Sequence, residues 1–418
     1  MRTGLRYLAV FAVWIIPLPV QAQEVTERAD SLEQEIRILK ARLDSLQRVL
    51  ERLVRAGEDT TEVVDELAAL RAAARAIVPE QPADTTPEQH VIRSRSLNRL
   101  NPEISVTGDV RLQGNWPGPQ EDNVDIREFS CGFQSALDPY SNTKVFFSFG
   151  EGEVGLEEAY AYWTGLPGGL RLDVGRFRLQ AGELNRWHLH ALPESEYPLV
   201  LTEYFGDEGL VSEGISLYWL APVSAVGGGV HEAWGQVTLA DNPVLFDGGR
   251  RLSLLGHLNN FWQLNPSTYF QIGGTALYGE NPDADLTTAA FGTDLRITWR
   301  PPERALYRSF TLRGEGFSVW RKTGGVGAIR YGGYVSADYQ TSRRIHLGGR
   351  FDYVERLDSD EHIWAVVPQL TWWQSEWVFL RAEWQHLSEP ATAIGRDTSD
   401  LFVIQIVWSI GPHKHESY

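Results

Sequence analysis

Residues 287–302 read TTAAFGTDLRITWRPP, and this stretch contains the pattern that decides the fold. Asp294 and Arg296 stand two residues apart with Leu295 between them, so a β-strand would place the two charges on one face and Leu295 on the other. The two prolines then end the strand in a tight turn. A strand with one charged and one apolar face fits the wall of a barrel that has lipid outside and water inside.

The same pattern recurs along the chain from about residue 103 to residue 410. The sequence therefore predicts an all-β fold: a sixteen-stranded antiparallel transmembrane β-barrel, preceded by an N-terminal α-helical coiled coil. An even number of strands places both ends of the barrel in the periplasm. The expected strands cover residues 103–114, 124–137, 140–150, 156–166, 169–177, 213–221, 225–240, 251–263, 267–279, 287–300, 305–320, 326–340, 343–357, 361–373, 376–388 and 400–410.

The connections between these strands are expected to alternate in length, with short turns in the periplasm and longer loops outside. Those after odd-numbered strands are mostly longer, and one, from about Arg178 to Ser212, is far longer than the rest. Tight turns are expected after even-numbered strands, at Asp138-Pro139, Pro167-Gly168, Pro222-Val223, Asn265-Pro266, Pro301-Pro302, Thr341-Ser342 and Gln374-Ser375.

Residues 1–22 have the parts of a secretory signal peptide: two arginines, an apolar run over residues 8–20 and a small-residue cleavage site before Gln23. An anchoring helix is the alternative, but the apolar run is too short to span a membrane. The expected location is the bacterial outer membrane, with the coiled coil in the periplasm.

Residues 23–57 are predicted to form the coiled coil, because apolar residues recur at spacings that alternate between four and three. A single helix packed on its own domain is the alternative. Residues 58–100 combine a second helical stretch with a Pro-rich linker, residues 101–412 form the barrel and residues 413–418 are a tail. The coiled-coil seam consists of Val25, Ala29, Leu32, Ile36, Leu39, Leu43, Leu46, Leu50 and Leu53.

The composition limits the classes of partner and activity. A formal net charge of −17 argues against nucleic acid as a partner. The 15 Trp, 15 Tyr and 17 Phe suit aromatic girdles at two membrane interfaces, although an array of water-soluble β-sandwiches is an alternative. The single cysteine, Cys131, allows no intrachain disulfide. The sequence contains no His-Glu-x-x-His, Cys-x-x-Cys or phosphate-loop motif, so we expect neither an enzyme nor a cofactor.

Charged residues two positions apart on the strands are expected to line a wet lumen, because a charge facing the bilayer midplane would cost about 2–4 kcal/mol. Sixteen strands leave room for an aqueous channel. An arginine–carboxylate lattice that braces the wall is an equally good interpretation for any one of these residues. They are Asp109, Arg111, Arg171, Asp173, Asp294, Arg296, Arg313, Glu315, Arg350, Asp352, Arg381 and Glu383.

The long connection after the fifth strand is expected to fold back into the barrel and narrow it. It is rich in acids, so a constriction made from it would favour cations. Its charged residues that we expect at the constriction are Glu183, Arg186, Glu194, Glu196, Glu203, Asp207 and Glu208. His188 and His190 in the same loop form a His-x-His pair that could bind a metal ion, with oxygens from Glu194 and Glu196. The alternative is that these histidines pack against the wall or lie in solvent.

Several segments of the chain resemble phosphate-selective porins of the O/P type in the outer membrane. They include FQSALDPYS at 133–141, VGRFR at 174–178, NRWHLH at 185–190, YFGDEGL at 204–210 and SIGPH at 409–413. The resemblance covers about residues 100–418 and implies a trimeric, sixteen-stranded porin with an inward-folded third loop. The acidic loop departs from the stacked arginines and lysines of phosphate-selective members.

The function expected from the sequence is a passive outer-membrane channel for small solutes or ions. Its expected partners are outer-membrane lipid and two further copies of the chain, joined through the barrel walls and the coiled coil. A zinc-type metal-ion receptor that uses the His-x-His loop is one alternative. A structural protein that links the outer membrane to the cell wall is another.

Overall fold

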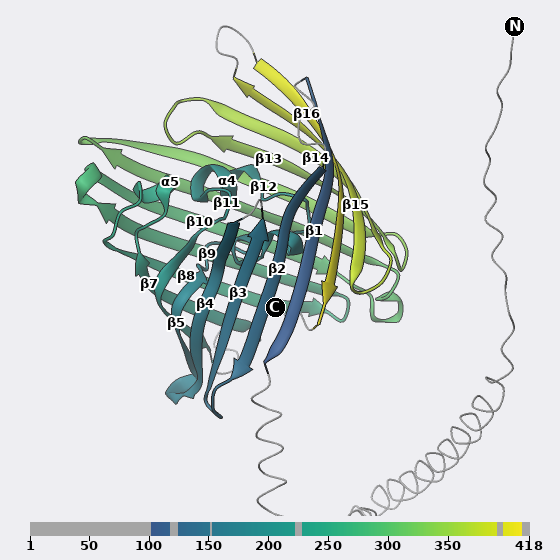
Figure 1. Ribbon diagram of the computed structural model, residues 1–418, viewed down its shortest axis with the longest axis horizontal. Helices are drawn as coiled ribbons and strands as arrows, with labels where there is room; N and C mark the ends of the chain where they lie inside the picture. The colour runs from purple at the N-terminus through teal and green to yellow at the C-terminus, as the bar shows by residue number, and fades with distance from the viewer. Residues whose placement is uncertain (1–101, 118–123, 151–152, 222–227, 391–395, 412–418) are drawn as a thin grey trace, which may run out of the picture. The chain divides into compact units, whose positions relative to one another are not determined.

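The computed structural model describes residues 102–117, 124–150, 153–221, 228–390 and 396–411. These residues belong to the second of two compact units, residues 88–418. They form one closed barrel of sixteen antiparallel strands, in which each strand pairs with its neighbours in sequence and β1 pairs with β16 (Figure 1). The predicted barrel is therefore confirmed. The predicted signal peptide, coiled coil, second helical stretch and linker lie outside the described residues.

Each predicted strand overlaps one observed strand. The strands are β1 (Glu103–Trp116), β2 (Val124–Ala136), β3 (Ser141–Gly150), β4 (Glu153–Leu166), β5 (Leu170–Arg178), β6 (Val211–Leu220), β7 (Val230–Leu239), β8 (Leu252–Asn265), β9 (Thr268–Asn281), β10 (Leu286–Trp299), β11 (Ser309–Thr323), β12 (Val326–Gln340), β13 (Ile345–Glu355), β14 (His362–Trp373), β15 (Val378–Pro390) and β16 (Arg396–Ile410). The short helices are η1 (Pro167–Gly169), η2 (Leu184–Arg186), η3 (Leu189–Ala191), α4 (Leu199–Phe205), α5 (Pro243–Phe246), η4 (Pro282–Ala284) and η5 (Pro302–Arg304).

The predicted alternation of short and long connections is only partly right. The tight turn expected at Pro301-Pro302 is wrong, because the 3₁₀ turn η5 begins there and β11 starts only at Ser309. Proline has a fixed φ that suits a first helical turn, so the pair starts a turn of helix instead of a hairpin. Conversely, β11 and β12 are joined by only Gly324 and Gly325, whose φ values of 59° and 83° suit a two-residue hairpin.

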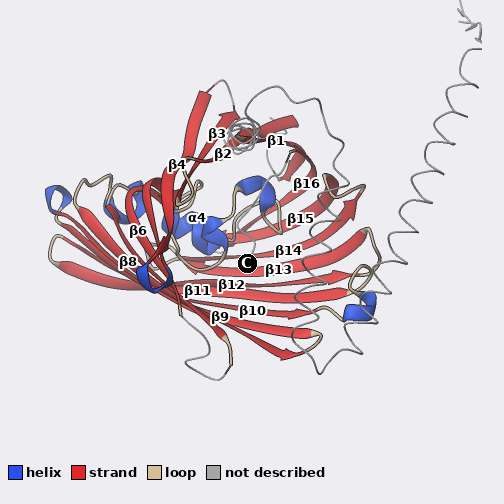
Figure 2. Cartoon of the chain, turned by 90° about the horizontal axis from the view of Figure 1, so that it is seen from below, coloured by secondary structure: helices blue, strands red, loops and turns tan. Residues whose placement is uncertain are grey.

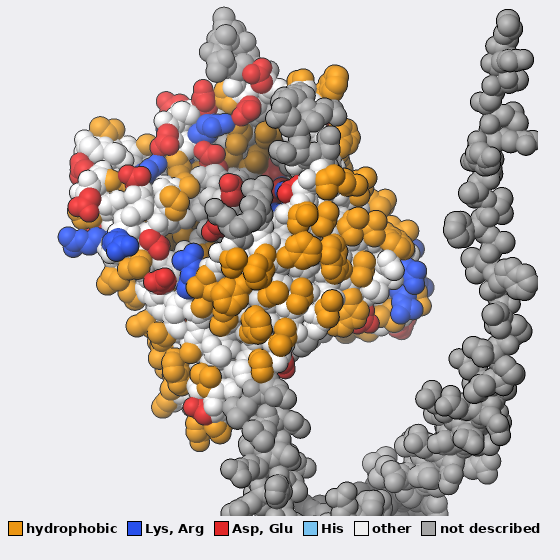
Figure 3. All heavy atoms as spheres, viewed as in Figure 1, with side chains coloured by type: hydrophobic (Ala, Val, Ile, Leu, Met, Phe, Trp, Pro, Cys, Tyr) orange, Lys and Arg blue, Asp and Glu red, His pale blue; other side chains and the backbone are white. Residues whose placement is uncertain are grey.

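The outer face of the barrel is apolar. On β13, for example, Phe351 and Tyr353 are exposed while Arg350 and Asp352, which alternate with them, are buried. Apolar side chains gather over neighbouring strands on the outside of the barrel (Figure 3). This is the surface that a lipid bilayer requires of a barrel wall. Within the described ranges, no helix is long and apolar enough to cross a membrane.

The hydrophobic core lies inside the barrel, between its wall and the connection from β5 to β6. Leu184, Val200 and Leu201 of this connection have no exposed surface and pack in one cluster with Phe317 of β11 and Val354 of β13. Figure 2 shows α4 within the ring of strands. The packing of such a segment against the wall fills part of the lumen that sixteen strands alone would leave empty.

Candidate functional site

The connection from β5 to β6, residues 179–210, folds into the lumen, and we call it the lumen loop. Leu179 N donates a hydrogen bond to Leu210 O at 2.9 Å, which closes its base. Asn185 strengthens this closure: its side-chain nitrogen donates to the carbonyls of Leu179 and Leu210, and its side-chain oxygen accepts from Leu210 N at 2.6 Å. The loop is therefore a compact element whose two ends are joined.

Glu315 of β11 holds the first turn of the lumen loop from the opposite wall. Its carboxylate accepts hydrogen bonds from Glu183 N at 3.2 Å, from Leu184 N at 2.9 Å and from the Tyr334 hydroxyl at 2.8 Å. Gly182 makes this approach possible, because a Cβ at its position would lie 1.8 Å from Glu315 Oε2 and its φ is +68°.

Three of the loop's glutamates pair with arginines of the wall. Glu183 Oε1 lies 2.8 Å from Arg296 Nη1 and 3.1 Å from Arg313 Nε. Glu194 lies 3.4 Å from Arg350, and Glu196 pairs with Arg111 and, at 2.9 Å, with Arg127. These contacts neutralise much of the loop's negative charge, so the premise of an uncompensated acidic constriction does not hold for these three residues.

The remaining acids lie at the exit of the loop. Asp207 and Glu208 are exposed, and Arg178 donates to the Glu208 carbonyl at 2.7 Å. Glu203 is half-buried; burial raises the pKa of its carboxyl group, and Arg356 opposes that effect. Asp207 and Glu208 are therefore the loop carboxylates most open to solvent.

All twelve predicted pore-lining residues lie on the inner side of the barrel wall, but few are open to water. Eight are buried, namely Asp109, Asp294, Arg313, Glu315, Arg350, Asp352, Arg381 and Glu383. The other four, Arg111, Arg171, Asp173 and Arg296, are half-buried. Arg350 pairs with Asp352 at 2.8 Å and Arg171 with Asp173 at 2.7 Å. The interpretation as a bracing lattice therefore describes the buried members well.

The His-x-His pair packs against the wall. His188 Nδ1 lies 2.5 Å from Glu157 and Nε2 lies 3.4 Å from Glu158, while His190 Nδ1 lies 3.5 Å from Glu128. Burial lowers the pKa of His188, but the two glutamates outweigh burial and raise it overall. Burial and the neighbouring His188 lower the pKa of His190 to about 3.

The metal interpretation gains nothing from this geometry. Glu194 and Glu196, the expected oxygen donors, point to arginines. Among the described residues there is no group of three or more His, Cys, Asp or Glu side chains that could hold a metal ion.

Sequence reasoning missed the charged cluster around His188, which includes Glu128, Glu157, Glu158 and Arg178. The cause is a pair of β-bulges. On β4 the register shifts so that Glu157 has no partner opposite it, and on β2 a shift skips Arg127. A bulge adds one residue and reverses the alternation of faces, so neighbours such as Glu157 and Glu158 both face inward. Adjacent charges within a predicted strand were the signal that could have found them.

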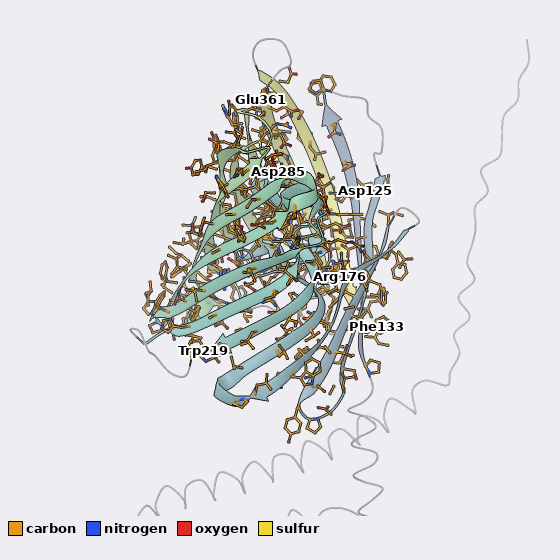
Figure 4. All side chains as sticks on the ribbon, turned by 90° about the vertical axis from the view of Figure 1, so that its left-hand side faces the viewer. Asp125, Phe133, Arg176, Trp219, Asp285 and Glu361 are labelled. Carbon is orange, nitrogen blue, oxygen red and sulfur yellow. The ribbon has the colours of Figure 1, made fainter. Side chains whose placement is uncertain are left out.

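Hollow spaces lie on both sides of the lumen loop. Figure 4 shows Asp285 and Glu361 toward one end of the barrel, which we call the loop end, and Phe133 and Trp219 toward the other. This second end carries the connections after even-numbered strands, and we call it the turn end. A cavity of about 390 Å³ lies toward the loop end beside Glu157, Arg178 and Glu208. Another, of about 670 Å³, lies toward the turn end beside Trp187 and Arg381.

Comparisons with known proteins agree on the fold. An anion-selective porin from Comamonas acidovorans superposes with a TM-score of 0.54 and 10% identity, covering 74% of this chain and 99% of that porin. OprB of Pseudomonas putida gives 0.53 and 11%, covering 77% and 97%. A loop-deletion mutant of OmpT, an outer-membrane protein of Vibrio cholerae, gives 0.52 and 9%, covering 74% and 99%. The chain thus has the fold of sixteen-stranded outer-membrane porins.

Sequence comparisons add little to this. No protein-family model matches the chain. An uncharacterized protein of Aquifex aeolicus is 41% identical over 87 residues, which is 21% of this chain and 18% of that protein. The chain therefore matches less than a fifth of the length of this curated relative.

Proposed function

We propose that this protein is a porin: a water-filled channel in the bacterial outer membrane through which small solutes or ions diffuse passively. The observation that carries the proposal is a closed barrel, apolar outside and charged inside, with a long loop folded into its lumen. A loop in this position narrows the barrel, and a cavity lies on each of its sides. The porin folds found by comparison support the same function.

Planar lipid bilayers test this proposal. Purified protein should produce discrete conductance steps in KCl, and a sample unfolded by boiling should produce none. Folded protein that inserts into the bilayer without conducting would contradict the channel and favour a purely structural role in the envelope.

Selectivity between small ions should be weak. Glu183, Glu194 and Glu196 are compensated by arginines, which leaves mainly Asp207 and Glu208 to attract cations. The reversal potential under a KCl gradient should therefore show a small cation preference that fades as salt increases. A strong anion preference would instead favour the phosphate-selective family that the sequence resembles.

A homotrimer is the assembly that we infer for the mature chain. The apolar outer wall offers surface for contact between barrels, and the heptad pattern of residues 23–57 offers a second contact. A solved form of OmpT from Vibrio cholerae is described as a trimer. Chemical cross-linking in native membranes should yield a band at three times the chain mass, and cross-linking that stops at the monomer would contradict the inference.

A further inference from the structure

The cavity at the turn end of the barrel has a lining unlike the rest of the lumen. It measures about 670 Å³ and is bounded by the lumen loop between Arg186 and Pro193. Aromatic and aliphatic side chains form much of its wall, among them Trp187, Trp373 and Phe379. A cavity of this size, with apolar walls and a small number of placed polar groups, has the character of a site for a small organic molecule.

Arg381 is the polar group in this wall that indicates a negatively charged ligand. It is 4% exposed. Its guanidinium donates to Thr371 Oγ1 at 3.3 Å, Gln405 Oε1 at 2.9 Å and Leu192 O at 3.0 Å. All three acceptors are neutral, and within the described part of the chain no carboxylate lies at ion-pair distance from Arg381. A buried guanidinium that has no direct carboxylate partner is stabilised by an anion placed against its free N–H groups.

Glu383, Glu194, Asp109 and Asp338 act on Arg381 electrostatically, Glu383 most strongly, but none of these described carboxylates lies at ion-pair distance from it. Glu383, two residues along β15, accepts hydrogen bonds from Ser195 N at 2.9 Å and Ser195 Oγ at 2.6 Å. Asp338 lines the same cavity but pairs with His346 at 2.8 Å. Glu376 also lines the cavity and is exposed at the turn between β14 and β15.

The guanidinium has donors to spare for an anion. Arginine carries five N–H groups, and the contacts above use one on each of its three nitrogens. One N–H therefore remains on each terminal nitrogen, and such a pair is suited to the two oxygens of one carboxylate. Phe379 already lies with its ring centre 5.0 Å from the guanidinium carbon, so an apolar wall adjoins the charge directly.

The approach to this cavity is basic. A second cavity of about 850 Å³ at the turn end shares His346, Trp373, Glu376 and Trp377 with it. Arg300, Arg343 and Arg344 line this second cavity, and all three are exposed. Exposed charges of one sign around an entrance raise the local concentration of ions of the opposite sign.

We propose that the cavity beside Arg381 binds an organic carboxylate with an aromatic or similarly apolar body. Arg381 holds the carboxylate, and Trp373 and Phe379 pack against the body. The proposal rests on the proposed function in one respect, since the solute reaches the cavity by diffusion through the channel. It goes beyond that function because it names a class of solute and a residue that recognises it.

The test compares three probes on the purified, folded protein: 3-phenylpropionate, its uncharged amide and acetate. Binding is measured by quenching of tryptophan fluorescence, and block of the KCl current by each probe is measured in parallel. 3-Phenylpropionate should bind at least about ten-fold more tightly than either the amide, which lacks the charge, or acetate, which lacks the apolar body.

Substitutions test separately the residue that holds the carboxylate and the residue that packs against the apolar body. Arg381→Lys and Arg381→Gln should reduce binding of 3-phenylpropionate to the level of the amide. Trp373→Ala should reduce its advantage over acetate while leaving the preference for the acid over the amide. Arg321→Gln is the matched control, because Arg321 pairs with the exposed Asp358 at the loop end and should not affect binding. If the Arg381 variants fail to fold, the comparison of the three probes on the unchanged protein and on Trp373→Ala decides whether the site exists.

The possible outcomes test the proposed binding site and the proposed channel function independently. Equal binding of the acid and the amide, or no binding at all with a normal KCl conductance, would overturn the site and leave the channel standing. Binding that depends on Arg381 in a protein without conductance would support the site and count against the channel.

Discussion

Gly182 shows how closely the lumen loop is fitted to the barrel wall. Its φ of +68° suits glycine, and the space that a Cβ would need is occupied by Glu315 Oε2. The same carboxylate caps two backbone N–H groups of the loop. Gly182 is therefore required both for its positive φ and for the absence of a Cβ.

Gly182→Ala should loosen the loop and lower the free energy of unfolding by roughly 1–3 kcal/mol, the usual cost of holding a residue in a strained backbone conformation. The measurement is the denaturant midpoint, together with the rate of protease cleavage within residues 179–210. Gly235→Ala is the control, because nothing lies within 4 Å of a Cβ at that position. Equal effects of the two variants would show that the fit at Gly182 is unimportant.

His188 should make the loop sensitive to pH. Burial and Arg178 lower the pKa of His188, but Glu157 and Glu158 outweigh them and raise it in the folded protein. A group of this kind stabilises the folded state fully below its ordinary pKa of about 6.5, and this stabilisation is lost as pH rises through the folded value. Protease cleavage of the loop should therefore quicken above neutral pH, and His188→Gln should abolish the change. The same pH profile in both proteins would contradict this role.

At the scale of elements, the lumen loop is a unit joined to the wall by many separate contacts. Its ends meet between Leu179 and Leu210, so a short linker could close the gap. Ion pairs and hydrogen bonds reach from it to β1, β11, β13 and β15. The strands themselves pair with one another around the closed barrel.

Replacing residues 184–206 by a linker of about six Gly and Ser residues should leave the barrel folded and raise its conductance several-fold, because the obstruction is removed. Folding is checked by heat-modifiable migration in electrophoresis, and conductance is measured in planar bilayers. The control replaces the exposed tip, Asp358 to Asp360, by Gly-Ser-Gly and should conduct as the unchanged protein does. An unchanged conductance after loop replacement would show that the loop does not limit the channel.

The sequence was sufficient to predict the strands and the position of the loop, because both depend on local patterns. Alternation identified every strand, and an excess of chain between two strands identified the lumen loop. The partners of Glu183 or Glu194 could not be predicted, because they depend on the register of strands far away in sequence. The inward faces of Glu157 and Arg127 were missed because bulges break the alternation on which the prediction relies.

At the scale of the whole molecule, most charged side chains inside the barrel are paired with opposite charges, and the outer surface of the barrel is apolar. The buried arginines Arg313 and Arg350 each pair with a carboxylate, whereas no carboxylate of the described residues lies at ion-pair distance from Arg381. A barrel of this kind should pass small solutes with little regard to charge, apart from those that Arg381 retains. Its selectivity should be set chiefly by size, at the lumen loop.

Liposome swelling with a series of uncharged sugars tests this central claim most directly. Liposomes that contain the folded protein should swell quickly in a monosaccharide, more slowly in a disaccharide and hardly at all in larger oligosaccharides, and the loop-replaced protein should admit the larger sugars. No swelling even in the smallest sugar, with the protein shown to be folded and inserted, would contradict a water-filled channel narrowed by the lumen loop.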